Sequence, residues 1–163
     1  MMWSSIDRDQ VNTHIIFTRL FDASICDVFN ACTDEKQIAQ WWGPYGFTNP
    51  VCHWNACENG SIYVDMTASD GMVFPMTGIF HEIEIPRKIV FTSKAFEDDD
   101  GNIQLEVLNT VSLLSYNKKT KFILDAKVMK ATPLVKQSLE GMQEGWSQSL
   151  DKLENFLQTK LGA

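Results

Sequence analysis

The sequence predicts an α+β fold in which seven antiparallel strands form one curved sheet that wraps around a long C-terminal helix. Between residues 49 and 129, apolar and polar side chains alternate in about six runs separated by turn-forming residues, as in consecutive strands with one buried face. From residue 135 to residue 157, apolar side chains recur every three or four positions, as in a helix with one buried face. Residues 13–21, rich in β-branched and aromatic side chains, supply the seventh strand.

One domain is expected. A chain of 163 residues can bury roughly 70% of its unfolded surface, and 44% hydrophobic with 21% charged residues is an ordinary globular composition. We expect a flexible N-terminal segment at residues 1–12 and a single domain at residues 13–161. No apolar run reaches the ~18 residues of a membrane span, and the N-terminal residues lack the basic and apolar regions of a signal peptide. The expected location is therefore the cytoplasm.

Two short helices are expected after the first strand, over residues 23–33 and 34–42. In the first, apolar residues from Ile25 to Cys32 recur at helical spacing. Thr33 is expected to cap the second helix, with two acidic residues in its first turn. A Gly-Pro pair then ends that helix.

The alternation assigns inward faces to three strands, at residues 61–67, 72–80 and 120–128. These faces are formed by Ile62, Val64 and Met66, by Phe74, Met76, Gly78 and Phe80, and by Phe122, Leu124, Ala126 and Val128. Turns are expected at residues 58–60, 69–71, 85–87, 98–102 and 117–119.

One long helix is expected to close the chain, from Pro133 to about Lys160, with Thr132 as its N-cap and proline at its first position. Gly141 and Gly145 lie four positions apart on one face of this helix, where each glycine costs about 1 kcal/mol relative to alanine. Two explanations are open: close packing of the helix on the sheet, or a functional role in which the glycines leave room for a ligand or let the helix flex beside the entrance of a cavity.

Two adjacent tryptophans, Trp41 and Trp42, end the second predicted helix. Neighbouring helical residues point about 100° apart, so both cannot face one core if the helix continues. One is expected to fill the core while the other lines the mouth of the sheet, with Tyr45 and Phe47 continuing the rim. The alternative is that all four aromatic side chains seal the edge of the sheet.

Charge and motif content argue against several functions. A formal net charge of −7 disfavours nucleic-acid binding, which needs clustered Lys and Arg. The sequence has no nucleophile elbow, phosphate loop or metal-ligand cluster, so no catalytic residue, cofactor or metal site is expected. Cys52, His53 and Cys57 lack the spacing of a zinc site, and all four cysteines are expected to be free thiols.

Several segments resemble a known family. They are RLFDASICDVFNACTDEKQIAQWWGP at residues 19–44, Gly78–Ile83 before Pro86, Ile89–Thr92, and Gly145-Trp146 with Leu150, Leu153 and Leu157. With the order of elements they resemble the helix-grip fold of the SRPBCC superfamily, which includes START lipid-transfer domains and birch-pollen-allergen-like proteins. Within it, residues 14–160 are similar to the domain homologous to the C-terminal part of the activator of heat-shock protein 90 ATPase.

The WW-Gly-Pro segment and the Gly-Trp pair of the last helix are the most specific of these matches. The sequence departs from the family at residues 57–60, which read CENG where relatives have an Arg-x-Gly-Gly turn, and at residues 118–122, which read KKTKF in place of a Gly-Thr-Arg start to the last strand.

This resemblance implies that a small hydrophobic molecule binds, without catalysis, in a cavity between the sheet and the last helix. The candidate lining residues are Trp41, Trp42, Phe47, Val64, Met66, Phe74, Met76, Phe80, Met142, Gly145 and Trp146. Two other functions stay open: a module that binds a chaperone or another protein, and a cyclase-like or hydrolase-like enzyme that uses the cavity. The chain is expected to be a monomer or a homodimer.

Overall fold

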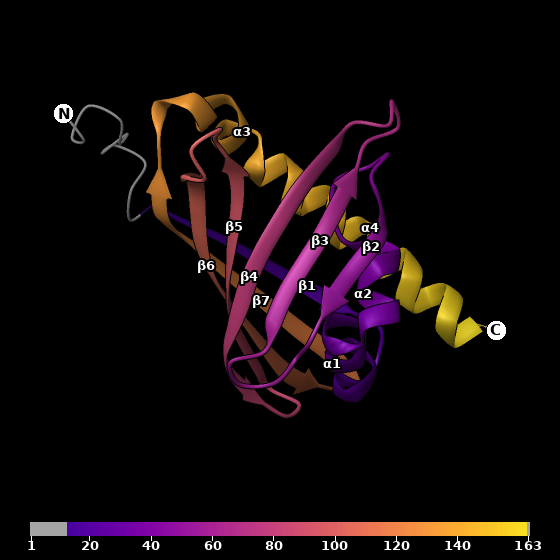
Figure 1. Cartoon of the computed structure of the whole chain (residues 1–163). Helices are drawn as coiled ribbons and strands as arrows, with labels where there is room; N and C mark the ends of the chain where they lie inside the picture. Colours follow the sequence, from indigo (N-terminus) through magenta and orange to yellow (C-terminus); the bar gives the residue numbers. More distant parts are fainter. Residues whose placement is uncertain (1–12, 163) are drawn as a thin grey trace.

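The computed structural model describes residues 13–162, so the predicted N-terminal segment, residues 1–12, lies outside the described residues. Its seven strands are β1 (His14–Phe21), β2 (Thr48–Trp54), β3 (Ser61–Thr67), β4 (Val73–Glu84), β5 (Lys88–Glu97), β6 (Ile103–Tyr116) and β7 (Lys119–Ala131). They form one antiparallel sheet in the order β1-β7-β6-β5-β4-β3-β2, which curves around the C-terminal helix α4 (Met142–Gly162) (Figure 1). The predicted fold is confirmed.

Two helices, α1 (Ile25–Thr33) and α2 (Glu35–Trp41), connect the two edge strands β1 and β2. The side chain of Ser24 accepts the backbone N–H of Asp27 at 3.1 Å and caps α1. The prediction that Thr33 caps α2 was wrong, because Thr33 ends α1 and its hydroxyl donates to the carbonyl of Phe29. Asp34 caps α2 instead, accepting the backbone N–H of Gln37 at 3.1 Å.

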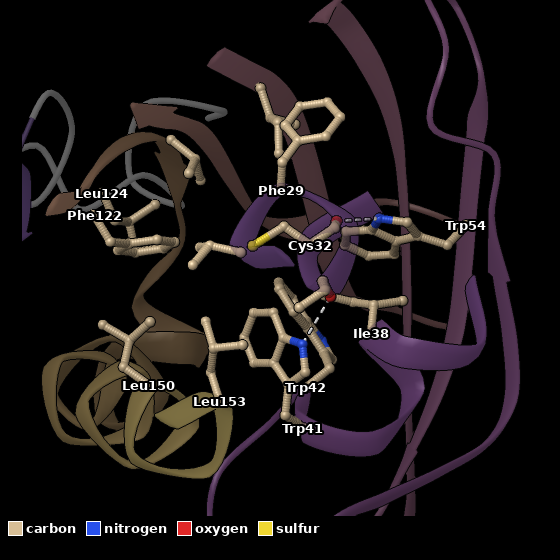
Figure 2. Packing of buried hydrophobic residues seen from close by; sticks show 14 of the residues in the cluster. Phe29, Cys32, Ile38, Trp41, Trp42, Trp54, Phe122, Leu124, Leu150 and Leu153 are labelled. Carbon is tan, nitrogen blue, oxygen red and sulfur yellow. Dashed lines mark hydrogen bonds between the residues drawn. The ribbon is translucent and has the colours of Figure 1, made fainter. Parts of the chain in front are cut away.

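Both tryptophans at the end of α2 enter the same core, although neighbouring residues of one continuous helix could not. The helix ends at Trp41, and Trp42 has extended dihedral angles, φ −61° and ψ 133°. This change of direction brings both indoles inward, with exposed fractions of 2% for Trp41 and 7% for Trp42 (Figure 2). Trp41 Nε1 donates to the carbonyl of Ala31 at 2.9 Å and thereby fastens α2 to α1.

The C-terminal segment is interrupted, which corrects the prediction of one helix from Pro133 to Lys160. A short 3-10 helix (Pro133–Val135) leads into α3 (Lys136–Glu140), Gly141 ends α3, and α4 follows. The hydroxyl of Thr132 caps no backbone N–H and donates instead to Gln104 Oε1 at 2.7 Å. The predicted apolar stripe is nevertheless buried at Val135, Leu139, Leu150, Leu153 and Leu157.

The core consists of two clusters on the inner side of the sheet. The larger one joins the sheet to α1, α2 and α4 and contains Trp41, Trp42 and Trp54 (Figure 2). The smaller one joins β6 and β7 to α3 and includes Val107 and Leu139. Within the described residues, no helix has both the length and the apolar character required to cross a membrane.

Two glycines, Gly78 and Gly141, should respond in opposite ways to alanine. At Gly78 in β4, a Cβ atom would lie 2.1 Å from the carbonyl oxygen of Thr92 in the neighbouring strand, so Gly78→Ala should lower the free energy of unfolding by about 3 kcal/mol. At Gly141, a Cβ atom would have only ordinary contacts at 3.7 Å and the backbone is helical, so Gly141→Ala should raise it by about 0.4–1 kcal/mol. Urea unfolding of both variants measures this, and equal changes would contradict the packing described for β4.

Candidate functional site

An open pocket of about 800 Å³ lies between the two core clusters. One wall is the inner face of strands β3 to β6, and the opposite wall is the segment around Gly141, where α3 meets α4. The loop that follows α2 forms the rim, with Gly43, Pro44 and Phe47 facing the pocket. The curved sheet and the interrupted helix thus leave a space that no core side chain fills.

Eight of the eleven candidate residues line this pocket: Trp42, Phe47, Met66, Phe74, Met76, Met142, Gly145 and Trp146. The other three, Trp41, Val64 and Phe80, lie in the larger core cluster and not in the pocket wall. Trp41 is directed to α1 by its hydrogen bond, and Phe80 packs against Trp54 and Phe91 at ring-centroid distances of 5.5 and 5.8 Å. Ligand binding by any of these residues stays a prediction.

Aromatic side chains form much of the wall. Trp42 and Trp146 pack edge to face, with centroids 5.2 Å apart, and join the rim loop to α4. Phe74 lies between Phe47 and Phe96, at 5.9 and 6.4 Å. Phe96 was not among the candidates, because alternation assigned no inward face to residues 88–97, and its positive φ of 60° also departs from strand geometry. Its side chain packs against the smaller core cluster and lines the pocket.

A second missed residue is Asn109, which lines the pocket from β6 with an exposed fraction of only 1%. Its Nδ2 donates to Ser93 Oγ at 3.1 Å, whereas its Oδ1 has no hydrogen-bond partner. A sequence signal was available, since the alternate positions Leu105, Val107, Val111 and Leu113 are apolar and asparagine interrupts them. The pocket therefore contains one buried amide among apolar side chains.

The rim loop is held on α4 by Lys152. Its Nζ donates to the carbonyls of Gly43, Pro44 and Phe47 at 3.1, 3.3 and 3.3 Å, and its burial lowers the pKa of this amine. At Gly145, a Cβ atom would lie 3.4 Å from Pro44 Cγ. Gly145 is thus part of the pocket wall and also the place where the loop approaches the helix.

An exposed polar cluster supports the same loop from outside. The hydroxyl of Tyr45 donates to Asp151 Oδ2 at 2.6 Å, and Arg19 Nη1 donates to Asp151 Oδ1 at 2.8 Å. These two hydrogen bonds hold the pKa of the Asp151 carboxyl below its ordinary value, and the bond to Asp151 raises the pKa of Tyr45. Gln148 Oε1 also accepts the backbone N–H of Tyr45.

Two cysteine thiols outside the pocket wall have raised pKa values. Burial raises the pKa of the Cys32 thiol to about 12 and, with the nearby Glu35, that of Cys52 to about 11, so neither forms a thiolate at neutral pH. All four cysteines are free. Among residues 13–162, no three His, Cys, Asp or Glu side chains lie close enough together to hold a metal ion.

Comparison with known proteins agrees with this architecture. The family model of Activator of Hsp90 ATPase homolog 1-like proteins matches residues 22–158. A solution structure from Arthrobacter aurescens has a TM-score of 0.79 at 23% identity, covering 95% of this chain and 91% of the other. The AHSA1 protein from Silicibacter pomeroyi has a TM-score of 0.77 at 23% identity, covering 91% and 99%. A protein from Chromobacterium violaceum has a TM-score of 0.77 at 21% identity, covering 89% and 96%. No curated protein matches the sequence significantly.

The variant Lys152→Met tests how the rim loop is held. It keeps an apolar stem of similar length but leaves three carbonyls without their donor, so the free energy of unfolding should fall by about 1–3 kcal/mol. Hydrogen exchange at the backbone N–H of Phe47 should become faster. The matched control is Lys160→Met, whose amine donates to Gln37 on the exposed surface and should change stability by less than about 0.5 kcal/mol. Equal losses for both variants would exclude this role of Lys152.

The variant Asp151→Asn tests the exposed cluster through pH. The pKa of Asp151 in the folded protein lies below its ordinary value of 3.8, so its carboxylate adds stability above that value and the contribution is lost as pH falls through the folded-state pKa. Between about pH 5 and pH 2, the wild type should therefore lose stability more steeply than Asp151→Asn. Urea midpoints over this range measure how stability depends on pH in both proteins. Parallel curves would show that the Asp151 carboxylate contributes no measurable stability.

Proposed function

We propose that this chain, which belongs to the Activator of Hsp90 ATPase homolog 1-like family, binds a small hydrophobic molecule without catalysis. The proposed site is the pocket between the sheet and the α3–α4 junction. The observation that carries this proposal is the pocket itself. Its volume of about 800 Å³ lies within the range of roughly 300–1,000 Å³ that is usual for sites of small ligands. Its wall is rich in methionine, which adapts to ligands of irregular shape.

Two of the three charged residues of the wall, Lys94 and Asp98, already have partners, which favours a neutral ligand. Lys94 forms an ion pair with Glu106 at 3.6 Å. Asp98 Oδ1 accepts the backbone N–H groups of Asp100 and Asn102, and these bonds hold the pKa of its carboxyl low. A charged ligand would have to compete with these internal interactions, whereas an apolar one only displaces water.

A protein partner is the second candidate, and the outer face of the sheet provides an observation in its favour. Leu20 of β1 and Leu114 of β6 both pair with Lys121 of β7 and are 52% and 50% exposed. The two leucines lie on either side of Lys121 in one row, and exposed apolar side chains are typical of a contact surface when they form a larger patch. Native mass spectrometry of the protein from its own cell extract separates the two candidates, since a retained small molecule favours the pocket and a retained protein favours the outer face.

Ligand binding should be visible in fluorescence and in thermal stability. Trp42 and Trp146 both line the pocket, so an apolar molecule bound there should change tryptophan emission. It should also stabilise the folded state by about 2.7 kcal/mol at a concentration one hundred times its dissociation constant. A screen of fatty acids, sterols and aromatic polyketides measures both effects, and a complete lack of response would contradict the proposal.

The variant Gly145→Leu locates the response. A leucine side chain at this position of the wall should fill part of the pocket and press on Pro44, so binding should be lost and stability should fall by about 1–3 kcal/mol. The matched control is Glu154→Leu, an exposed position of the same helix, which should bind as the wild type does. Equal binding by all three proteins would place the ligand elsewhere.

A further inference from the structure

The amide of Asn109 is buried in a wall that also contains the apolar side chains of Met76, Val107 and Met142. It belongs to the inward face of β6, between Val107 and Val111, and pairs across the sheet with Phe91 of β5 and Ala126 of β7. Replacing a valine by asparagine in such a row costs free energy unless the amide is fully hydrogen-bonded. Only the nitrogen of this amide is hydrogen-bonded, and its oxygen has no partner.

The orientation of the amide follows from its neighbours. Nδ2 faces the carbonyls of Phe91 and Val107 at 3.4 Å each, which can only accept, and Ser93 Oγ at 3.1 Å, which can accept or donate. The opposite orientation would set the amide oxygen against both carbonyls, so the orientation with Nδ2 on this side is favoured. Oδ1 therefore points away from the Ser93 side, and it is one of the few buried polar atoms in the described residues without a partner.

One other such atom belongs to the pocket wall, Trp42 Nε1. This N–H is a donor on an indole surrounded by aromatic rings, and the plane of the Trp146 ring lies at 87° to that of Trp42. The face of an aromatic ring can accept an N–H group. A carbonyl oxygen has no comparable interaction with an aromatic face, because both carry negative partial charge. Asn109 Oδ1 is therefore the atom that a ligand can satisfy.

We propose that the pocket selects a hydrophobic molecule that carries a hydroxyl or N–H group, and that Asn109 Oδ1 accepts a hydrogen bond from this group. The apolar body of the ligand then lies against Met76, Met142 and Phe74, while Ser93 holds the amide in place. This inference rests on the proposed function and adds the chemical class of the ligand.

Three probes of one shape test it: para-hydroxybiphenyl, para-methoxybiphenyl and para-methylbiphenyl, of which only the first can donate. Dissociation constants are measured by tryptophan fluorescence and calorimetry for the wild type and for Asn109→Leu, which keeps a similar volume and removes the acceptor. The preference is the dissociation constant of the methoxy probe divided by that of the hydroxyl probe. We expect this ratio to be about tenfold lower in Asn109→Leu than in the wild type, because one hydrogen bond is lost. The methyl probe should bind both proteins equally or favour the variant.

The control is Thr120→Val, which removes a buried hydroxyl outside the pocket and should leave the preference unchanged. Thermal unfolding shows which variants are folded, and if Asn109→Leu is not, the wild type alone must still bind the hydroxyl probe more tightly than the methoxy probe. An unchanged preference in Asn109→Leu, or a tighter methoxy probe in the wild type, overturns the inference and leaves the proposed function standing. Failure of all three probes to bind overturns both.

Discussion

The position of Trp42 is the constraint on which the rest of the structure depends. Because α2 ends one residue earlier, the indole of Trp42 reaches the centre of the molecule and packs against rings from α2, β2, β5 and α4, namely Trp41, Trp54, Phe91 and Trp146. Asn49 Nδ2 donates to the carbonyls of Trp42 and Ala39, which the end of the helix leaves without partners. The same residue thus closes the larger core cluster and begins the wall of the pocket.

The strands and the apolar helical stripe could be predicted because burial on one face leaves a local period in the sequence. The failures occurred where one residue changes the backbone direction. Gly141 ends α3 without disturbing the helical spacing of apolar residues, so a continuous helix and an interrupted one have the same pattern. Phe96 with positive φ, and Trp42 in an extended conformation, depend on tertiary packing that the pattern does not contain. All three of these residues line the pocket.

Asn109 is a different case, because its position was predictable and its role was not. Alternation places it inside, and a buried oxygen without a partner costs about 1–3 kcal/mol, which valine or leucine at this position would avoid. Local preference and global fold normally agree in a stable sequence, and conflicts between them concentrate at functional sites. The pocket unites several such conflicts: an interrupted helix, a strained phenylalanine and an unpaired amide within one wall.

The structure also gives a physical reason for the segments that carry the family resemblance. The WW-Gly-Pro segment and the Gly-Trp pair of the last helix lie about a hundred residues apart in sequence but pack directly on each other, since Trp42 contacts Trp146 and a Cβ atom at Gly145 would lie 3.4 Å from Pro44. A bulkier side chain at Gly145 would press on the loop, and a smaller one at Trp42 would leave a void at the centre. These motifs therefore specify how the loop closes on the helix, which is a property of the fold. The amide that we assign to ligand selection lies on β6, outside both motifs, so relatives can share the fold and differ in the molecule they bind.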